Sequence, residues 1–344
     1  KGILFQGNGG TIDVADGLGE LYIDGDIASD SLYRGDLIKV GAGTLTLNGV
    51  TVNATNANQP GNGLFRGLID VRQGTLRVNG DVGNAAASAT AQASSTMFGT
   101  SNSYMDGTIF RSGTNLAIQM GNANDTGDWF LDEWMTFKGN NYVSVGTINT
   151  QTVNTNDTAT TGVLNPVAFN PNNERTVNLG GVITVEGTTT FDVVPGQTLR
   201  LGLTNQVNVG TTASGYLTGS GTIIKDGQGT MTLNTNNPDF TGAITVLQGR
   251  LTGVGQADFF GTGYTVANGS KVITLGSADR QGTVELTLTS DSIHGGTIEL
   301  NHNLNVVYNP VQTKRLLLET FVNGSQIELN GNITLNDNLQ LYIN

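Results

Sequence analysis

The segment 217–251 constrains the fold of this chain more than any other, because it sets three short β-type runs one after another with glycines between them. It reads LTGSGTIIKDGQGTMTL and, after a short break, FTGAITVLQGRL. A less complete copy lies at residues 37–48, LIKVGAGTLTLN, and continues at 67–76. Repetition of a strand-and-glycine unit along one chain predicts a solenoid. It also argues against an enzyme, since every conspicuous residue of the unit serves backbone geometry.

Short runs with period-two alternation recur almost throughout the chain. Each is four or five residues long, with aliphatic side chains on one face and Thr, Glu, Asp or Arg on the other, as in a half-buried strand. Asn-Gly, Asp-Gly and Gly-Gly pairs between them are typical of turns. The runs lie at 10–14, 21–24, 44–47, 75–78, 182–185, 189–193, 198–201, 284–288, 297–300 and 326–329.

Alternation alone also suits a sandwich or a propeller, so the spacing of the runs has to decide. Equivalent runs return after roughly 14 to 30 residues, which is wider than a hairpin meander and fits coils with loop insertions. No helix-forming stretch is present to build β-α-β crossovers. We therefore predict an all-β fold, a parallel β-helix. At roughly 20 to 25 residues per coil and about 4.8 Å between coils, it would have about 14 to 17 coils.

Segment 217–251 resembles the autotransporter-associated β-strand repeat, with Met231 in place of a leucine. From the lysine to the last glycine, the early copy runs about 11 residues longer. The matching residues are Lys225, Gly227, Gly229, Thr230, Leu233, Phe240, Thr241, Gly242, Gly249 and Leu251, and in the early copy Lys39, Gly41, Gly43, Thr44, Leu45 and Leu47.

This resemblance implies a right-handed parallel β-helix in a secreted or surface-exposed bacterial passenger. Passengers of this kind include adhesins, aggregation factors and toxins, with any enzymatic activity on added domains. The resemblance thus specifies the scaffold and leaves the function open.

Composition narrows the range of partners. The net charge is −12, from 28 acidic and 16 basic residues, and no basic run occurs, so nucleic acid and anionic membrane surfaces are not expected partners. The chain has no cysteine, which excludes disulfides and thiolate metal sites and suits an exported bacterial protein. No apolar window approaches about 20 residues, so no membrane insertion is expected.

One region breaks the rhythm of short strands. Residues 84–135 start with an Ala/Ser-rich stretch and end with both tryptophans of the chain, so we expect an inserted loop or small subdomain there, between β-helix coils at 1–83 and 136–344. A smaller Asn/Thr-rich excursion spans 149–175. Both chain ends read as strands, so we expect a fragment of a longer protein.

The aromatic residues of this insertion, Trp129, Phe130 and Trp134, are the candidate binding residues. Exposed aromatics bind protein partners or stack on sugar rings. The alternative is that they form the insertion's own small core, which a loop of this length requires.

Three further patterns are interpreted as structural. Arg34-Gly35-Asp36 spells the integrin-binding tripeptide, but it directly precedes a predicted strand, so we interpret it as accidental. His294 and His302 lack an accompanying carboxylate cluster and are expected to be structural. The acidic patches at 24–30 and 124–128 match no calcium loop and are expected to be solvated turns. No catalytic residue, metal or cofactor is predicted.

The sequence as a whole predicts a non-enzymatic extracellular stalk with a structural or adhesive role. Its expected partners are copies of itself, a neighbouring or host cell surface, or a glycan. The alternative is a secreted carbohydrate-active or carbohydrate-binding β-helix. A groove lined by carboxylates and aromatics would favour that alternative, and a polar rod with an apolar interior would favour the stalk.

Overall fold

The computed structural model of the chain describes residues 3–5, 7–23, 27–29, 35–48, 67–80, 107–120, 129–132, 134–147, 175–202, 216–233, 237–254, 260–261, 264–265, 269–270, 272–289, 297–300, 302–320 and 326–344. All regular elements in these residues are β-strands. The described part of the chain accordingly contains no helix that could span a membrane.

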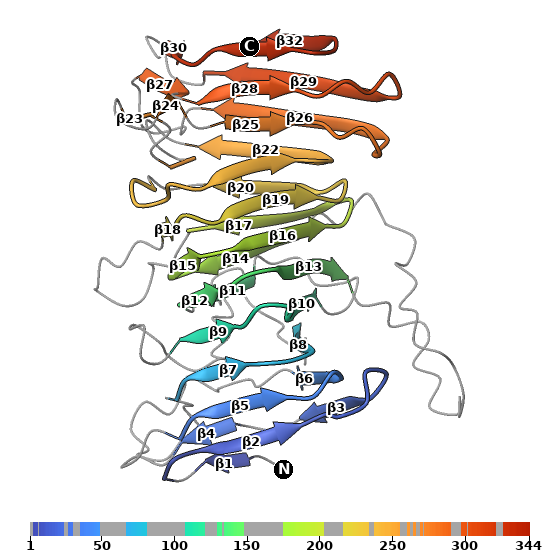
Figure 1. Cartoon of the computed structure of the whole chain (residues 1–344), viewed down its shortest axis with the longest axis vertical. Coiled ribbons are helices and arrows are strands. Elements are labelled where there is room, and N and C mark those ends of the chain that lie inside the picture. The colour runs from blue at the N-terminus through green and yellow to red at the C-terminus, as the bar shows by residue number, and fades with distance from the viewer. Residues whose placement is uncertain are drawn as a thin grey trace, which may run out of the picture.

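Three parallel sheets account for most of the described strands, which stack along the long axis of the molecule (Figure 1). The eleven-stranded sheet contains, in order, β3 (Glu20–Ile23), β6 (Thr44–Asn48), β8 (Thr75–Gly80), β10 (Asn115–Met120), β13 (Asn141–Thr147), β16 (Thr188–Val193), β19 (Thr222–Asp226), β21 (Ala243–Val246), β25 (Val272–Leu275), β28 (Asn303–Val306) and β31 (Ile333–Leu335).

The other two long sheets are built in the same way. The eight-stranded sheet contains β11 (Trp129–Asp132), β14 (Arg175–Gly180), β17 (Gln197–Leu201), β20 (Thr230–Leu233), β22 (Gly249–Val254), β26 (Gly282–Thr289), β29 (Gln312–Glu319) and β32 (Leu339–Ile343). The seven-stranded sheet contains β2 (Gly10–Asp13), β5 (Leu37–Val40), β7 (Ile69–Val71), β9 (Thr108–Phe110), β12 (Met135–Phe137), β15 (Val182–Val185) and β18 (Tyr216–Thr218).

Three pairs of strands complete the described elements. Parallel pairs join β1 (Ile3–Phe5) to β4 (Ile27–Ser29) and β27 (Thr297–Leu300) to β30 (Gln326–Leu329), and an antiparallel pair joins β23 (Tyr264–Thr265) to β24 (Gly269–Ser270).

From β9 to β20 the chain passes through the three long sheets in rotation, from the seven-stranded to the eleven-stranded to the eight-stranded sheet. Strands β15, β16 and β17 form one such passage, and β18, β19 and β20 form the next, each pairing in parallel with its predecessor. We call one passage a coil and the turn between two sheets a corner. Because each coil gives one strand to the eleven-stranded sheet, the described residues form eleven coils. This topology is consistent with the predicted β-helix.

The predicted number of coils, about 14 to 17, is too high for the described residues. Coil length varies widely, which the assumption of a nearly constant repeat did not allow. The register partners Thr222 and Ala243 are 21 positions apart, whereas Thr75 and Asn115 are 40 apart. Loops of very different length therefore return the chain to the same register.

Apolar side chains of successive coils stack in columns inside the molecule. The rings of Phe110 and Phe137 stack at 5.0 Å with an interplanar angle of 12°, and Phe137 meets Phe191 edge-on at 6.0 Å. All three side chains are fully buried. Such aromatic pairs contribute beyond the apolar area that they bury. One column of the eleven-stranded sheet consists of Leu45, Leu76, Leu116, Val143 and Phe191.

Part of the range 84–135, in which an insertion is predicted, lies in strands of the long sheets. Within that range, residues 107–120 contribute β9 and β10, and both strands pair with coils on either side. Strand β11 joins the eight-stranded sheet. Their short apolar runs were hidden by the polar, irregular sequence around them. Residues 84–106 and 121–128, and residues 149–174 of the second excursion, lie outside the described residues.

The aromatic column yields a first prediction. Replacing Phe137 with Ala should lower the free energy of unfolding by about 3 to 5 kcal/mol, because it leaves a cavity between two other rings. The measurement is urea unfolding followed by far-ultraviolet circular dichroism. The matched control is Thr136→Ala, on the outward face of the same strand, which should cost less than about 1 kcal/mol. Equal losses in the two variants would contradict the prediction.

Candidate functional site

The lysines of the two repeat copies lie inside the molecule. Lys39 and Lys225 are both 0% exposed, at positions where neighbouring coils carry apolar residues. Lys225 is the register partner of Phe191 on one side and Val246 on the other. A buried ammonium group is costly unless hydrogen bonds replace its water. The contacts of the two lysines therefore decide what the repeat does.

Each ammonium group donates hydrogen bonds to three backbone carbonyls. Lys225 Nζ reaches the carbonyl oxygens of Asp226 at 2.6 Å, Gly227 at 2.7 Å and Gln248 at 3.2 Å. The first two belong to its own corner, and the third belongs to the corner of the next coil. An ammonium has three N–H donors, so all of them are used. The lysine thus ties two successive corners together.

Lys39 makes the same set of contacts. Its Nζ donates to the carbonyls of Val40 at 2.9 Å, Gly41 at 2.6 Å and Gln73 at 3.0 Å. The last acceptor lies 34 positions along the chain, whereas for Lys225 it lies 23 positions along. The additional 11 residues of the early copy are therefore accommodated without loss of this contact.

The two copies occupy different corners of the coil. Lys39 lies in β5 of the seven-stranded sheet, before the turn to the eleven-stranded sheet. Lys225 lies in β19 of the eleven-stranded sheet, before the turn to the eight-stranded sheet. The local geometry is nevertheless shared. Gly41 has φ +79° and Gly227 has φ +74°, and a Cβ on either would lie 2.3 Å from an Asp oxygen of the preceding coil. The repeat therefore encodes a corner, independent of the sheets that it joins.

The outer side of the Lys225 corner carries a row of polar side chains. Tyr142 donates a hydrogen bond to the carboxylate of Asp192, and Arg280 forms an ion pair with Asp226 at 2.8 Å. Asp192 and Asp226 are register partners on adjacent coils. Burial raises the pKa of Asp226, but hydrogen bonds from Arg280 and from Gly227 N, with the nearby charges, hold it below its usual value.

This arrangement lacks the properties of an acid–base pair. A general acid in glycoside hydrolysis needs a carboxyl group with a raised pKa. The pKa of Asp226 is lowered instead, and that of Tyr142 is raised by burial and by its hydrogen bond to Asp192. The row therefore fits a structural role better than a catalytic one.

A different set of contacts forms the same kind of corner in the last two coils. Lys314 is buried, donates to the Asn309 carbonyl and pairs with Asp337 of the next coil. The hydrogen bonds from Lys314 and from two backbone N–H groups lower the pKa of Asp337 to about 2. Gln312 Nε2 adds a hydrogen bond to the Leu247 carbonyl at 2.7 Å. A buried lysine at a corner is thus used outside the recognisable repeat as well.

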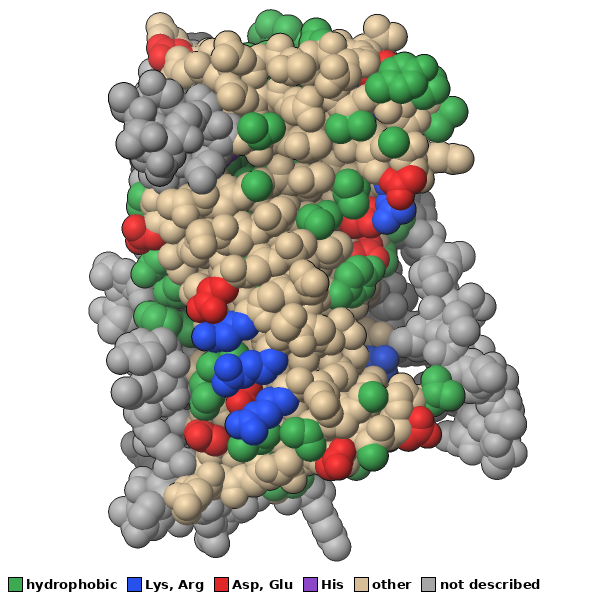
Figure 2. Space-filling view, in the orientation of Figure 1, with side chains coloured by type: hydrophobic (Ala, Val, Ile, Leu, Met, Phe, Trp, Pro, Cys, Tyr) green, Lys and Arg blue, Asp and Glu red, His purple; other side chains and the backbone are tan. Residues whose placement is uncertain are grey.

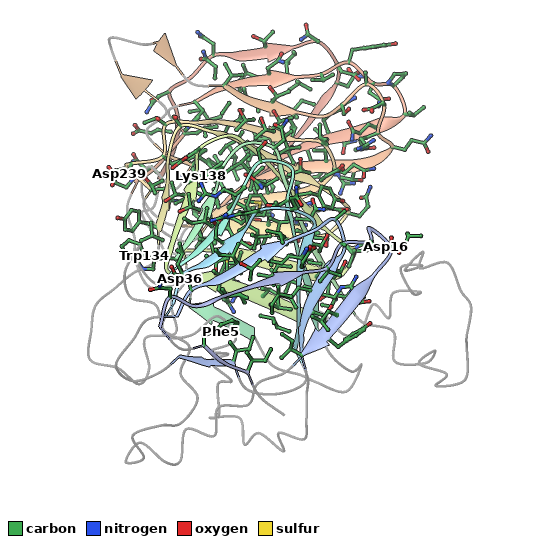
Figure 3. All side chains as sticks on the ribbon, turned by 60° about the horizontal axis from the view of Figure 1, so that its bottom comes forward. Phe5, Asp16, Asp36, Trp134, Lys138 and Asp239 are labelled. Atoms are coloured by element: carbon green, nitrogen blue, oxygen red, sulfur yellow. The ribbon has the colours of Figure 1, made fainter. Side chains whose placement is uncertain are left out.

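Two of the three aromatic residues proposed for binding lie in a strand of the eight-stranded sheet. Trp129 and Phe130 lie in β11, in register with Val177 and Asn178 of β14. Trp134 directly precedes β12, and its carbonyl accepts a hydrogen bond from Thr108 N at 2.8 Å. Its side chain is half-buried, on the side of the molecule where Asp36 and Asp239 also lie (Figure 3). Binding by these three aromatics stays a prediction.

The described part of the Arg34-Gly35-Asp36 tripeptide takes part in coil stacking. One carboxylate oxygen of Asp36 accepts a hydrogen bond from Leu68 N of the next coil at 2.9 Å. A Cβ on Gly35 would lie 2.7 Å from Phe5 Cβ. Arg34 lies outside the described residues. The interpretation of this tripeptide as accidental stays a prediction.

The histidines and the acidic patches are the remaining polar residues considered for a functional site. His302 is buried, with its ring 6.3 Å from that of Phe260 in an edge-on contact. His294, the acidic residues of the patch at 24–30 (Asp24, Asp26 and Asp30) and the patch at 124–128 lie outside the described residues. Within the described part of the chain, no three histidine or carboxylate side chains are grouped closely enough to hold a metal ion.

Comparison with known proteins finds a similarity over part of the chain. Over 152 residues the chain is 31% identical to the probable autotransporter YfaL of Escherichia coli (strain K12). The match covers 43% of this chain and 10% of that protein. No protein-family model matches the chain, and no solved structure matches it. The chain is thus related to a probable autotransporter over part of its length, which suggests an exported surface protein.

The lysine contacts yield a second prediction. Replacing Lys225 with Met keeps an unbranched side chain but leaves three corner carbonyls without their donor, so the free energy of unfolding should fall by about 2 to 4 kcal/mol. Lys39→Met should act alike, and urea unfolding measures both. Lys138→Met, at an exposed lysine 3.4 Å from Glu186, is the control and should cost less than about 1 kcal/mol. An unchanged free energy of unfolding in Lys225→Met would rule out a stabilising role for the lysine.

A third prediction concerns pH. Burial lowers the pKa of Lys225 from 10.5 to about 7, although Asp192 and Asp226 oppose the shift. Between these two values the unfolded chain binds more protons at this residue than the folded chain, so the Lys225 contribution to stability rises with pH. The stability difference between wild type and Lys225→Met should therefore be larger at pH 9 than at pH 6. Urea midpoints at both pH values measure it, and a smaller difference at pH 9 would contradict the assignment.

Proposed function

We propose that the chain is part of a non-enzymatic extracellular stalk, a right-handed parallel β-helix with autotransporter-associated repeats, which serves a structural or adhesive role on a bacterial surface. The observation that carries this proposal is the use of the repeat residues in contacts between coils. The lysines bind carbonyls of two corners, the glycines permit close approach of the preceding coil, and the alternating aliphatic residues fill the interior.

Two further observations support the stalk over an enzyme. The carboxylates in register at the Lys225 corner are engaged by Tyr142 and Arg280, and the pKa of Asp226 is lowered. The partial identity to a probable autotransporter favours export. Binding of a carbohydrate without catalysis is the second candidate function, and the exposed basic side chains of Arg72, Arg111 and Lys138 favour it.

The proposal predicts that the chain lies outside the producing cell. Antibodies raised against purified chain should label intact cells, and brief external protease should remove the label while a cytosolic marker survives. Loss of the gene should change cell–cell aggregation or attachment, measured by settling rate and surface retention. Labelling confined to permeabilised cells would overturn the surface location, and unchanged aggregation and attachment would overturn the adhesive role.

A further inference from the structure

Three basic side chains stand in a row at one corner of three successive coils. Arg72, Arg111 and Lys138 each directly follow the last residue of a strand in the seven-stranded sheet, β7, β9 and β12. Arg111 N donates to the Val71 carbonyl at 2.9 Å and Lys138 N to the Phe110 carbonyl at 2.8 Å, so the three residues are in register. At the spacing of parallel strands, the row spans about 10 Å.

The row is the main basic feature of one face of the molecule. Figure 2 shows Lys and Arg side chains gathered in a short column over the region of β7, β9 and β12 in Figure 1. The side chains of Arg72, Arg111 and Lys138 are 51%, 45% and 37% exposed. They are three of only 16 basic residues in a chain of net charge −12, so their alignment concentrates positive charge locally.

A single buried carboxylate orients the two arginines. Asp70 accepts hydrogen bonds from Arg72 Nε at 2.8 Å and from Arg111 Nε and Nη2 at 2.8 and 3.2 Å. These contacts hold both guanidinium groups by their inner edges and leave further N–H donors on each for a ligand. A guanidinium held in this way is preorganised to bind a second carboxylate or a sulfate.

The lysine at the end of the row is loosely held. Lys138 Nζ lies 3.4 Å from Glu186, and the two side chains are 37% and 48% exposed. An exposed ion pair of this length contributes little, so an incoming anion can replace Glu186 at small cost. The three cations thus face solvent with one carboxylate beneath them and one at the end of the row.

A second row of neutral polar groups runs beside the basic one. Gln73, Ser112 and Asn140 lie one or two residues further along the same three corners, and all three are exposed. Gln73 Oε1 accepts from Gly41 N at 3.0 Å and Ser112 Oγ from Asn140 N at 3.3 Å. Their amide N–H and hydroxyl groups can bond to hydroxyl groups of a ligand.

We propose that this corner, comprising Arg72, Arg111, Lys138, Gln73 and Ser112, binds a linear acidic polysaccharide, with carboxylates on the basic row and sugar hydroxyls on the polar row. Single-stranded nucleic acid fits less well, because the described residues of this strip include no aromatic side chain on which bases could stack. The inference deepens the proposed function by assigning a partner to the stalk surface.

Binding of polygalacturonate to the purified chain tests the assignment. Calorimetry should detect binding at about 50 mM salt that weakens steeply at about 500 mM, because exposed charges are screened. The triple variant Arg72→Gln, Arg111→Gln, Lys138→Gln should bind about tenfold more weakly or worse, a loss of about 1.4 kcal/mol. A second triple variant, Arg200→Gln, Arg250→Gln, Arg315→Gln, removes the same charge from the eight-stranded sheet and should stay within about threefold of wild type.

Two further ligands serve as specificity controls, and a thermal melt checks that the variants are folded. Fully methyl-esterified polygalacturonate, which is uncharged, should not bind, and single-stranded DNA should bind more weakly than polygalacturonate. Circular dichroism melting should confirm that both triple variants are folded. Absence of polygalacturonate binding, equal losses in the two triple variants, equal binding of the ester, or tighter binding of DNA would each overturn the proposal. These results come from purified chain, so a failure here is distinct from a failure of cell-surface labelling.

Discussion

The structure depends on how the coil corners hold their backbone carbonyls. Strands satisfy their hydrogen bonds with the next coil, whereas some carbonyls at a corner need donors from elsewhere. Lys39 and Lys225 supply donors from inside, three for each ammonium group. Because one of the three acceptors belongs to the next coil, the same group also fixes how successive corners stack. An apolar residue at this position would fill space and leave the carbonyls unpaired.

This interaction explains why the repeat can move between corners and tolerate insertions. The lysine bonds only to carbonyls of its own corner and to one carbonyl of the next coil. The sheets that the corner joins can therefore differ, as they do for the two copies. The loop between lysine and final acceptor can lengthen by 11 residues, because loop-closure entropy rises slowly with length. A rod built from such corners keeps its register while its loops vary.

The sequence predicted the parts of the structure that depend on local alternation. Period-two runs and glycine turns indicated short strands and parallel stacking, and the runs at 44–47 and 75–78 became β6 and β8. The number of coils could not be predicted because the loops vary in length, and β9 was missed because its three residues do not stand out from polar surroundings. The buried lysines were also missed, because lysine in an alternating run is ordinarily solvated. Both lysines occupy the same alternate positions of their runs as the inward-facing aliphatic residues. This alternation was the sequence signal that could have identified them as buried.

Basic residues in this chain either support a corner from inside or lie on the surface, and a shift of one position along a strand separates the two roles. At the corner after the seven-stranded sheet, Lys39 lies in register with Val71 and points inward, whereas Arg72, one residue later on the next coil, points outward. Side chains alternate between the two faces of a sheet, so a shift of one residue changes a basic group from an internal support to a surface group. Because the internal support is confined to a few corners, other corners of the stack are free to carry ligand-binding side chains. The row from Arg72 to Lys138 begins at the corner whose Gln73 carbonyl binds Lys39 and continues over the next two corners.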